Sequence, residues 1–528
     1  MTSTVHTADA ARRFDAEAIE NLHIPSLVLM EHAAAKMTES ITRNFPEATE
    51  IAILCGPGNN GADGLAIARL LAHAGRRPHV YIDENARLSP DEKTWLQSIR
   101  AQQIPADSFE QFSAKTGLKE SAGKFDLIVD ALFGSGLNRP LTGRWADLVE
   151  AVNSSGLPVV SVDIPSGING NTGKGETAVQ CDLTLALDCL KTGHLFNYGK
   201  TASGKIEILD ITIPSWLHEQ DPEKIFLIDR MMASRGLPVR SDALNKGRFG
   251  KILMCGGSLA MQGALSMAAM SCFHAGIGTL TLYTPKSAAQ ALASKLDLAM
   301  ILAADEVQGF FSVDAAGRLE DLLDRYTFAS CGNGMGTGLG AMEVTRTMLA
   351  SNLGLVLDAD GLNCAARHPE WLSRQAPLIL TPHLAEFSRL SGFSLQEIEE
   401  DPLRCIRTFM EVHPNVILIL KSDMTFVAGQ SRIALLNEPC SALSKGGSGD
   451  VLAGLAAALC AQTDDYFEAC CSAVYIHNRA ARQACFDERN PHRPRRKINP
   501  ACFTPLDLIS HYSMVFNELD LIRQKAEG

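Results

Sequence analysis

Short apolar runs alternate along the chain with longer stretches of helical character. In the first half these runs occupy residues 50–54, 126–129 and 158–162. In the second half they occupy residues 251–254, 354–357, 377–380 and 416–420. Nearly continuous apolar runs are typical of parallel strands that helices cover on both faces. The pattern therefore predicts an α/β protein throughout.

The chain of 528 residues is too long for one ordinary core. A polar stretch at 214–222 contains two prolines and follows a strand-like run at 206–213. We therefore predict an N-terminal domain at residues 1–220 and a larger C-terminal domain at residues 221–528.

The composition of the chain indicates a globular protein and argues against several other classes. A hydrophobic content of 46% with 20% charged residues is ordinary for a globular protein. The net charge of −12 argues against binding to nucleic acid or anionic membranes. No apolar run is long enough to span a bilayer, and the charged first thirty residues do not resemble a secretory signal. Fourteen cysteines without a CxxC pair suit a reducing compartment, so we expect a cytoplasmic protein.

The glycine-rich segment 446–450 ends in Asp450 and leads directly into an apolar, helix-forming run. Free backbone N–H groups at a helix start favour an anion. An acid beside such a site suits a base that deprotonates a hydroxyl attacking a phosphate. These five residues alone are equally consistent with a plain turn whose acid complements the helix dipole.

Three polar loops in the first half each follow a predicted strand. They begin at Cys55, Asp130 and Asp163. Loops beyond the carboxyl ends of parallel strands line a ligand crevice. Their Asn and Asp oxygens suit a hard cation or ligand hydroxyls, although the same residues also tolerate left-handed turns. The first loop is not GxGxxG, so it predicts no dinucleotide fingerprint.

The loop sequences GPGNNGADG, VDALFGSGLNR and VDIPSG resemble the epimerase domain of NAD(P)H-hydrate repair enzymes over about residues 10–215. The resemblance implies a Rossmann-like three-layer fold that binds the hydrated nicotinamide cofactor with K⁺. The implied K⁺ ligands are Asn60, Asp130 and Ser166. The implied substrate contacts are Asn59, Asn60, Gly61, Ala62, Asp63, Gly134, Ser135, Gly136, Leu137, Asn138, Arg139, Pro140 and Asp163.

Asp163 is our candidate for acid/base catalysis in the first half. Lys191 is a candidate partner, although a solvated loop lysine explains it equally well.

An ordered series of motifs accompanies the segment 446–450, each next to a predicted strand. The members are residues 245–251 with 255–258 and 263–264, then 332–336, 358–363 and 380–386. The series resembles the ribokinase-like superfamily, and within it the nucleotide-dependent NAD(P)H-hydrate dehydratases, over about residues 240–515. The resemblance implies a three-layer α/β fold in which the nucleotide phosphorylates the ring hydroxyl. The phosphate then leaves far more readily than hydroxide would.

Residue roles in the second half follow from this resemblance. Asp450 would deprotonate the hydroxyl, and the backbone N–H groups of Gly447, Ser448 and Gly449 would hold the transferring phosphoryl. The implied nucleotide contacts are Lys421, Ser422, Asp423, Met424, Thr425 and Gly449. The implied substrate contacts are Ala264, Gly336, His383 and Asp450. We expect Mg²⁺ to enter with ADP, bridging its phosphates.

The chain departs from the dehydratase pattern at four places. Met261, Asn333 and Ala385 stand where the family usually has Tyr, Pro and Gly, and residues 444–447 replace a Thr-Gly-Gly. These changes bear on substrate fit rather than on the type of reaction.

The predicted function is metabolite repair by two active sites in one chain. The first would interconvert the R and S hydrates of NADH and NADPH, and the second would dehydrate the S form with ADP, giving AMP and phosphate. Alternatives are a vitamin-alcohol kinase with a fused, non-catalytic binding domain, or an N-terminal scaffold without catalysis. The expected partners are small molecules, without nucleic acid or membrane, and we expect a homo-oligomer.

Overall fold

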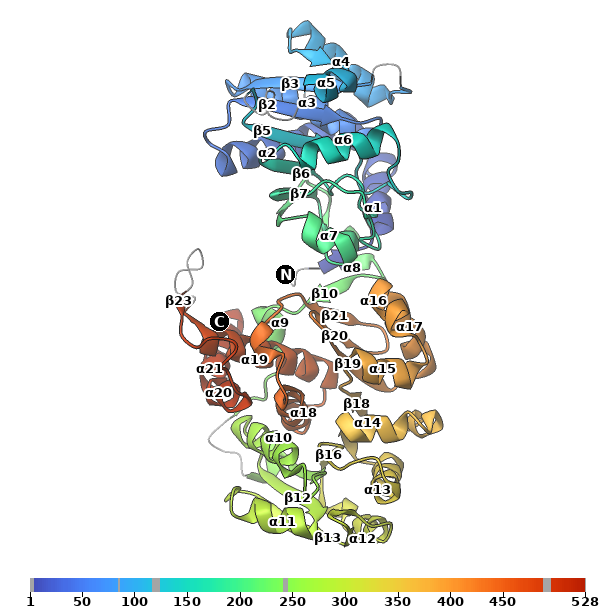
Figure 1. Ribbon diagram of the computed structural model, residues 1–528, viewed down its shortest axis with the longest axis vertical. Coiled ribbons are helices and arrows are strands. Elements are labelled where there is room, and N and C mark those ends of the chain that lie inside the picture. Colours follow the sequence, from blue (N-terminus) through green and yellow to red (C-terminus); the bar gives the residue numbers. More distant parts are fainter. Residues whose placement is uncertain (1–3, 84–85, 116–123, 241–245, 488–494, 528) are drawn as a thin grey trace. The chain divides into compact units, whose positions relative to one another are not determined.

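The computed structural model describes residues 4–83, 86–115, 124–240, 246–487 and 495–527. The chain divides into two compact units, one formed by Thr4–Ile225 and one beginning at Phe226. We call them the N-unit and the C-unit (Figure 1).

The N-unit is built on a parallel sheet in the order β4-β3-β2-β5-β6-β7-β9. These strands are β2 (Glu50–Cys55), β3 (Arg77–Ile82), β4 (Ala106–Asp107), β5 (Leu127–Ala131), β6 (Val159–Val162), β7 (Leu183–Leu187) and β9 (Lys205–Leu209). Two short strands, β1 (Thr4–His6) and β8 (Leu190–Lys191), pair with each other in parallel. The helices are α1 (Ala8–Glu20), α2 (Ser26–Asn44), α3 (Asn59–His73), α4 (Pro90–Ala101), α5 (Phe109–Lys115), α6 (Arg144–Asn153), α7 (Asn197–Ala202) and α8 (Ser215–Gln220).

Alternating side chains place apolar residues on both faces of this sheet. Ile51 and Ile53 pack with residues of α1 to α4 in one core. Ala52 and Leu54 pack with residues of α5 and α6 in the other. The N-unit therefore has the predicted three layers of helix, sheet and helix.

The C-unit continues the α/β pattern with the strand order β13-β12-β11-β16-β17-β18-β19-β20-β21. Its strands are β11 (Lys251–Cys255), β12 (Thr279–Pro285), β13 (Met300–Ala304), β16 (Phe328–Cys331), β17 (Gly354–Leu357), β18 (Leu378–Leu380), β19 (Val416–Lys421), β20 (Thr425–Ala428) and β21 (Ile433–Leu436). The strands from β13 to β19 are parallel, and β20 and β21 are antiparallel. Shorter strands are β10 (Ile225–Leu227), β14 (Glu306–Val307), β15 (Phe310–Phe311), β22 (Phe486–Asp487) and β23 (Arg495–Arg496).

Helices cover both faces of the C-unit sheet (Figure 1). One layer contains α9 (Arg230–Arg235), α10 (Gln262–His274), α11 (Lys286–Ala293), α18 (Ser448–Cys460), α19 (Tyr466–Cys485), α20 (Pro505–Ser510) and α21 (Tyr512–Glu527). The other contains α12 (Ala315–Glu320), α13 (Leu339–Ala350), α14 (Ala359–Ala365), α15 (Leu384–Ser391), α16 (Leu395–Glu400) and α17 (Pro402–Val412). The apolar α18 is buried almost completely in the first layer, among strand residues such as Met254 and Val356. The predicted α/β class is confirmed.

Two local expectations were wrong. The strand predicted at 206–213 ends at Leu209, because Thr212 has a left-handed φ of 73° that turns the chain out of the sheet. The segment GPGNNGADG was predicted to be a loop, but α3 starts at Asn59, so the polar residues 59–63 form the first turns of this helix. Gly58, with φ 116°, makes the turn that allows this early start.

Within the described ranges, every helix is too short or too polar to span a bilayer.

Candidate functional site

A cavity of about 630 Å³ lies in the N-unit beside the carboxyl ends of β2, β5 and β6. Most of the side chains predicted to bind there line it: Asn59, Asn60, Asp63, Gly134, Ser135, Gly136, Leu137, Asn138, Arg139, Asp163 and Lys191. Gly61, Ala62 and Pro140 are not among its lining residues. The structure therefore brings residues from three distant motifs to one cavity.

Gly61 has a packing role instead. A Cβ at this position would lie 1.8 Å from the carbonyl oxygen of Gly56, so no other residue fits this turn. Ala62 is fully buried beside it. These two residues hold α3 against the loop and thereby position the side chains of Asn60 and Asp63.

Asp163 and Lys191 form a buried ion pair at the cavity wall. Lys191 Nζ donates to Asp163 Oδ1 at 2.7 Å and also to the carbonyl oxygens of Leu187 (2.6 Å) and Cys189 (3.3 Å). Lys191 is 2% exposed, so it is not the solvated loop lysine that the sequence also allowed. Asp163 itself has a left-handed φ of 66°, a strained conformation of a kind that gathers at functional sites.

The ion pair fixes the charge of both groups. Burial alone would raise the pKa of Asp163, but the charge and hydrogen bond of Lys191 hold it below its ordinary value. Burial acts to lower the pKa of Lys191, yet Asp163 raises it above the ordinary value. His194 Nε2 lies 2.8 Å from the backbone oxygen of Asp163, and burial lowers the pKa of this histidine to about 4. At neutral pH, Asp163 is therefore an ionised carboxylate supported by a neutral histidine.

The surroundings of Asp63 shift its pKa in the direction opposite to that of Asp163. Asp63 is only 7% exposed and lines the same cavity. Burial, together with the neighbouring charges of Asp163 and Asp15, raises its pKa well above the ordinary value. Two carboxyls whose environments shift their pKa values in opposite directions are a recurring arrangement of an acid and a base.

Asp130 and Ser166 lie under the cavity wall. Asp130 is fully buried and accepts hydrogen bonds from the backbone N–H (2.8 Å) and the hydroxyl (2.6 Å) of Ser166. Among the described residues no Lys or Arg pairs with it, and burial raises its pKa. Asp130 is therefore a buried acid held by hydrogen-bond donors. Asn60, which lines the cavity, has a side-chain Nδ2 that is buried with no partner among the described residues.

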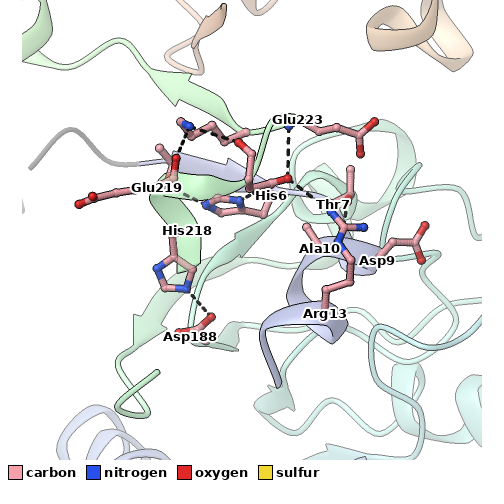
Figure 2. A network of polar contacts seen from close by, with 12 residues as sticks. His6, Thr7, Asp9, Ala10, Arg13, Asp188, His218, Glu219 and Glu223 are labelled. Atoms are coloured by element: carbon pink, nitrogen blue, oxygen red, sulfur yellow. Dashed lines mark hydrogen bonds and ion pairs between the residues drawn. The ribbon is translucent and has the colours of Figure 1, made fainter. Parts of the chain in front are cut away.

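The sequence did not predict a network of polar contacts that lies next to the cavity (Figure 2). His6 Nδ1 lies 2.8 Å from Asp221 Oδ2, and His218 Nε2 lies 2.8 Å from Asp188 Oδ2. Asp188 lines the cavity, and its hydrogen bond raises the pKa of His218. No local motif marks these residues, because they come from both ends of the unit.

The C-unit site is built across four neighbouring parallel strands. Asn333, Asp358, Thr381 and Lys421 follow or end β16, β17, β18 and β19, which are adjacent in the sheet. Asp358 Oδ1 accepts from the hydroxyl of Thr381 (2.7 Å) and from Lys421 Nζ (3.1 Å). The predicted motifs therefore meet at one edge of the sheet.

Asp450 lies above this edge in the first turn of α18. Its Oδ1 accepts a 2.7 Å hydrogen bond from Asn333 Nδ2. Burial raises the pKa of Asp450 to about 6, while the Asn333 hydrogen bond opposes the rise and the charge of Asp358 adds to it. A carboxylate with this pKa is an effective base near neutral pH.

The glycine-rich turn has the geometry of an anion site. Gly447 is the N-cap of α18 with a left-handed φ of 94°, and no side chain caps the helix. Burial lowers the pKa of His477 to about 4. Its Nε2 lies 2.9 Å from the carbonyl oxygen of Ser448 and steadies the first turn. Of the three N–H groups predicted to hold the phosphoryl, that of Ser448 donates to the carbonyl oxygen of Lys445 at 3.2 Å. Those of Gly447 and Gly449 have no partner among the described residues and are the ones left for an anion.

Some of the other residues predicted to bind the nucleotide or the substrate lie near this turn, and the rest lie in neighbouring loops and helix starts. Lys421 Nζ lies 3.2 Å from where a Cβ on Gly449 would stand. Residues 422–424 connect β19 to β20, which begins at Thr425. Gly336 donates its N–H to Asp360 at 2.8 Å, and His383 caps α15 through Nδ1. Ala264, on the first turn of α10, lies beside Gly334. Asn245 of the first C-terminal motif lies outside the described residues.

Comparison with known proteins matches both halves. The profile of the family described as YjeF-related protein N-terminus matches residues 26–193, and that of NAD(P)H-hydrate dehydratase matches residues 252–495. The bifunctional NAD(P)H-hydrate repair enzyme Nnr of Thermofilum pendens is 33% identical over 88% of this chain and 89% of its own. The enzyme of the same name from Coxiella burnetii is 31% identical over 86% of this chain and 90% of its own.

A solved structure also resembles the second half. The ADP/ATP-dependent NAD(P)H-hydrate dehydratase of Bacillus subtilis, co-crystallised with ATP and Mg²⁺, covers 56% of this chain and 98% of its own. Its identity is 23% and its TM-score is 0.48.

Proposed function

Because this chain belongs to the family of bifunctional NAD(P)H-hydrate repair enzymes, we propose that each unit carries one of the two activities. Residues 1–220 would form the epimerase domain and residues 221–528 the ADP-dependent dehydratase domain. The observation that carries the proposal is the pair of separate acid/base sites, Asp163 with Lys191 and Asp450 with the α18 turn.

In the N-unit we propose that Asp63 and Asp163 act as acid and base. Interconversion of the hydrates breaks the C–O bond at the ring carbon beside the ring nitrogen and re-forms it on the other face. Asp63 protonates the departing hydroxyl, which leaves as water while the nitrogen lone pair forms a C=N bond. Water then adds to the opposite face and gives a proton to Asp163. Exchange with solvent returns both carboxyls to their resting states.

Both carboxyls face the same space, which supports this reaction. Asp63 on α3 and Asp163 after β6 line one cavity of about 630 Å³, and the charge of Asp163 acts on Asp63. A cavity of this size has room for a ring between them. Lys191 already donates to three acceptors. We therefore assign it to holding Asp163 ionised rather than to proton transfer.

We further propose that the buried Asp130, with Ser166 and Asn60, holds K⁺. Its role would be electrostatic, because a cation there offsets the buried charge of Asp130 and fixes the loop after β5 that borders the cavity. Gly134 of this loop lies next to Asn60 Oδ1, which would be 3.1 Å from a Cβ on the glycine.

In the C-unit we propose that Asp450 takes the proton from the ring hydroxyl as it attacks the terminal phosphoryl of the nucleotide. The α18 turn from Gly447 to Gly449 receives the negative charge of the phosphoryl. Lys421, close to Gly449, neutralises the nucleotide phosphates, with residues 422–425 beside it. Expulsion of phosphate, with loss of a proton from the neighbouring ring carbon to solvent, then restores the C=C bond of the dihydronicotinamide, and ADP becomes AMP. Mg²⁺ would arrive with the nucleotide and screen its phosphates.

A spectroscopic assay tests both activities. Hydrated NADH is supplied with ADP or ATP, and the return of the reduced nicotinamide absorbance is followed. We expect the S hydrate to be dehydrated directly, and the R hydrate to be consumed faster than its spontaneous epimerisation allows. Failure to regenerate NADH from the S hydrate with either nucleotide would remove the proposal for the C-unit.

The alternative of a vitamin-alcohol kinase shares the α18 turn and the base. It would yield a stable phosphorylated product instead of reduced nicotinamide. The cavity in the N-unit, with its buried ion pair and a carboxyl whose pKa is raised, favours repair, because a scaffold needs none of these groups. The homo-oligomer and the cytoplasmic location stay predictions, to be checked by light scattering and by cell fractionation.

A further inference from the structure

Asn333 occupies an unusual position between two carboxylates of the C-unit. Its side-chain Nδ2 donates to Asp450 Oδ1 at 2.7 Å and to Asp358 Oδ2 at 3.1 Å. The residue is fully buried, and its own Oδ1 has no partner among the described residues. An amide NH₂ carries two protons, so Asn333 can satisfy one oxygen of each acid simultaneously.

The backbone around Asn333 is also tightly held. Its carbonyl oxygen accepts a 2.7 Å hydrogen bond from Gly257, in the loop after β11. Gly332 and Gly334 on either side have left-handed φ values of 127° and 68°. A Cβ on Gly332 would lie 1.9 Å from the carbonyl oxygen of Asp358. The amide therefore reaches Asp450 from a rigid loop, which restricts where the carboxylate can point.

We infer that Asn333 is a positioning residue for the dehydratase base, and that its amide holds Asp450 Oδ1 so that Oδ2 is directed to the substrate hydroxyl. Oδ2 has no hydrogen-bond partner within the part of the chain that the structure describes. The inference rests on the proposed role of Asp450. It adds a side-chain donor to the proposed base.

Asn333 also favours the ionised form of Asp450. The charged groups acting on Asp450 are Asp358 and Asp360, which oppose its ionisation, and Lys421, which favours it. His477 and His383 lie close to the same turn and strand edge, and burial lowers the pKa of each, so both are neutral near pH 7. Burial and the two acids favour the protonated form of Asp450. The Asn333 donor favours the ionised form, so its loss should raise the pKa of Asp450.

The test is the pH dependence of kcat/KM for dehydration of the S hydrate in the full-length protein. Asn333→Leu removes the donor at similar volume, and we expect the acidic limb to move up by about one unit, because a donor to a charged group has that order of effect. At pH 6 the variant would be roughly fivefold slower than the wild type, while at pH 9 it would be within about threefold. Asn333→Asp, which puts a third carboxyl in place of the donor, would move the limb further.

Asn478→Leu is the matched control. Asn478 is a buried asparagine of the same unit (7% exposed) whose Nδ2 donates to the backbone oxygen of Glu438 at 2.7 Å. We expect it to lower stability without moving the pH profile. An unchanged limb in both Asn333 variants, or an equal loss at every pH, would overturn the inference. High activity of Asp450→Asn would instead overturn the proposed role of the base.

Discussion

Individual side chains of the two sites are tuned by partners distant in the chain. Lys191, 28 positions away in the chain, favours the ionised form of Asp163. Asn333, 117 positions away from Asp450, donates a hydrogen bond to it. Burial among other acids raises the pKa of Asp63 and so favours its protonated form. The same residue type thus takes three different roles, each set by its surroundings rather than by its intrinsic acidity.

Asp163→Asn should reduce epimerisation by about two to four orders of magnitude, the usual range for loss of a general base. The measurement is the rate at which purified R hydrate becomes a substrate for dehydration. Dehydration of the S hydrate by the same variant is the internal control and should stay at the wild-type rate. Normal epimerisation would exclude the assignment of Asp163.

Asp63→Asn should stop epimerisation and stabilise the N-unit above neutral pH. The pKa of Asp63 is raised in the folded state, so the fold loses stability as pH rises above the unfolded pKa of about 4. An amide carries no such penalty. We expect the thermal midpoint to rise by roughly 2–4 °C at pH 8 and to be unchanged at pH 4. Calorimetry at both pH values checks this, and a drop at pH 8 would contradict a neutral Asp63.

The start of α18 positions the proposed phosphate site. The left-handed Gly447 ends the turn, and a Cβ there would meet Met267 at 2.5 Å and Pro505 at 3.1 Å. The neighbouring Gly446 has no atom within 4 Å of such a Cβ. The two glycines of one motif therefore have different structural demands.

Gly447→Ala should impair dehydration and cost about 1–3 kcal/mol of stability, because it combines backbone strain with a clash. Gly446→Ala is the matched control and should be close to wild type in both respects. Nucleotide affinity by calorimetry and the unfolding midpoint of the C-unit are the measurements. Equal behaviour of the two variants would show that the turn geometry is not what binds the phosphates.

The complete chain combines two compact units, each with its own sheet and its own set of acids. No catalytic residue that we assign to one unit comes from the other. The two activities should therefore be separable by single substitutions in the intact protein.

Asp450→Asn should lose dehydration by about 10²–10⁴-fold and keep epimerisation. Mixing it with Asp163→Asn should restore conversion of the R hydrate to NADH, because each variant supplies the step that the other lacks. The assay follows reduced nicotinamide from R hydrate with ADP. If the mixture did no better than Asp163→Asn alone, the two activities would depend on each other within one chain.

Local sequence patterns were sufficient for the seven strands that they predicted, for the α/β class and for the polar motifs that follow those strands, because apolar periodicity and glycine-rich turns are properties of neighbouring residues. They did not predict β3, β7, β12, β13 or β16. They were insufficient for the start of α3, the end of β9 and the network of His6, Asp188 and His218.

The tertiary structure alone determines which acid has a lowered pKa, which has a raised pKa and which amide holds the base. Ionisation depends on burial and on partners brought together across the sheet, and Asn333 meets Asp450 only because β16 and α18 pack at one edge. The sequence motifs therefore predicted most of the candidate site residues. Their ionisation and their hydrogen-bond partners depend on contacts that exist only in the folded chain.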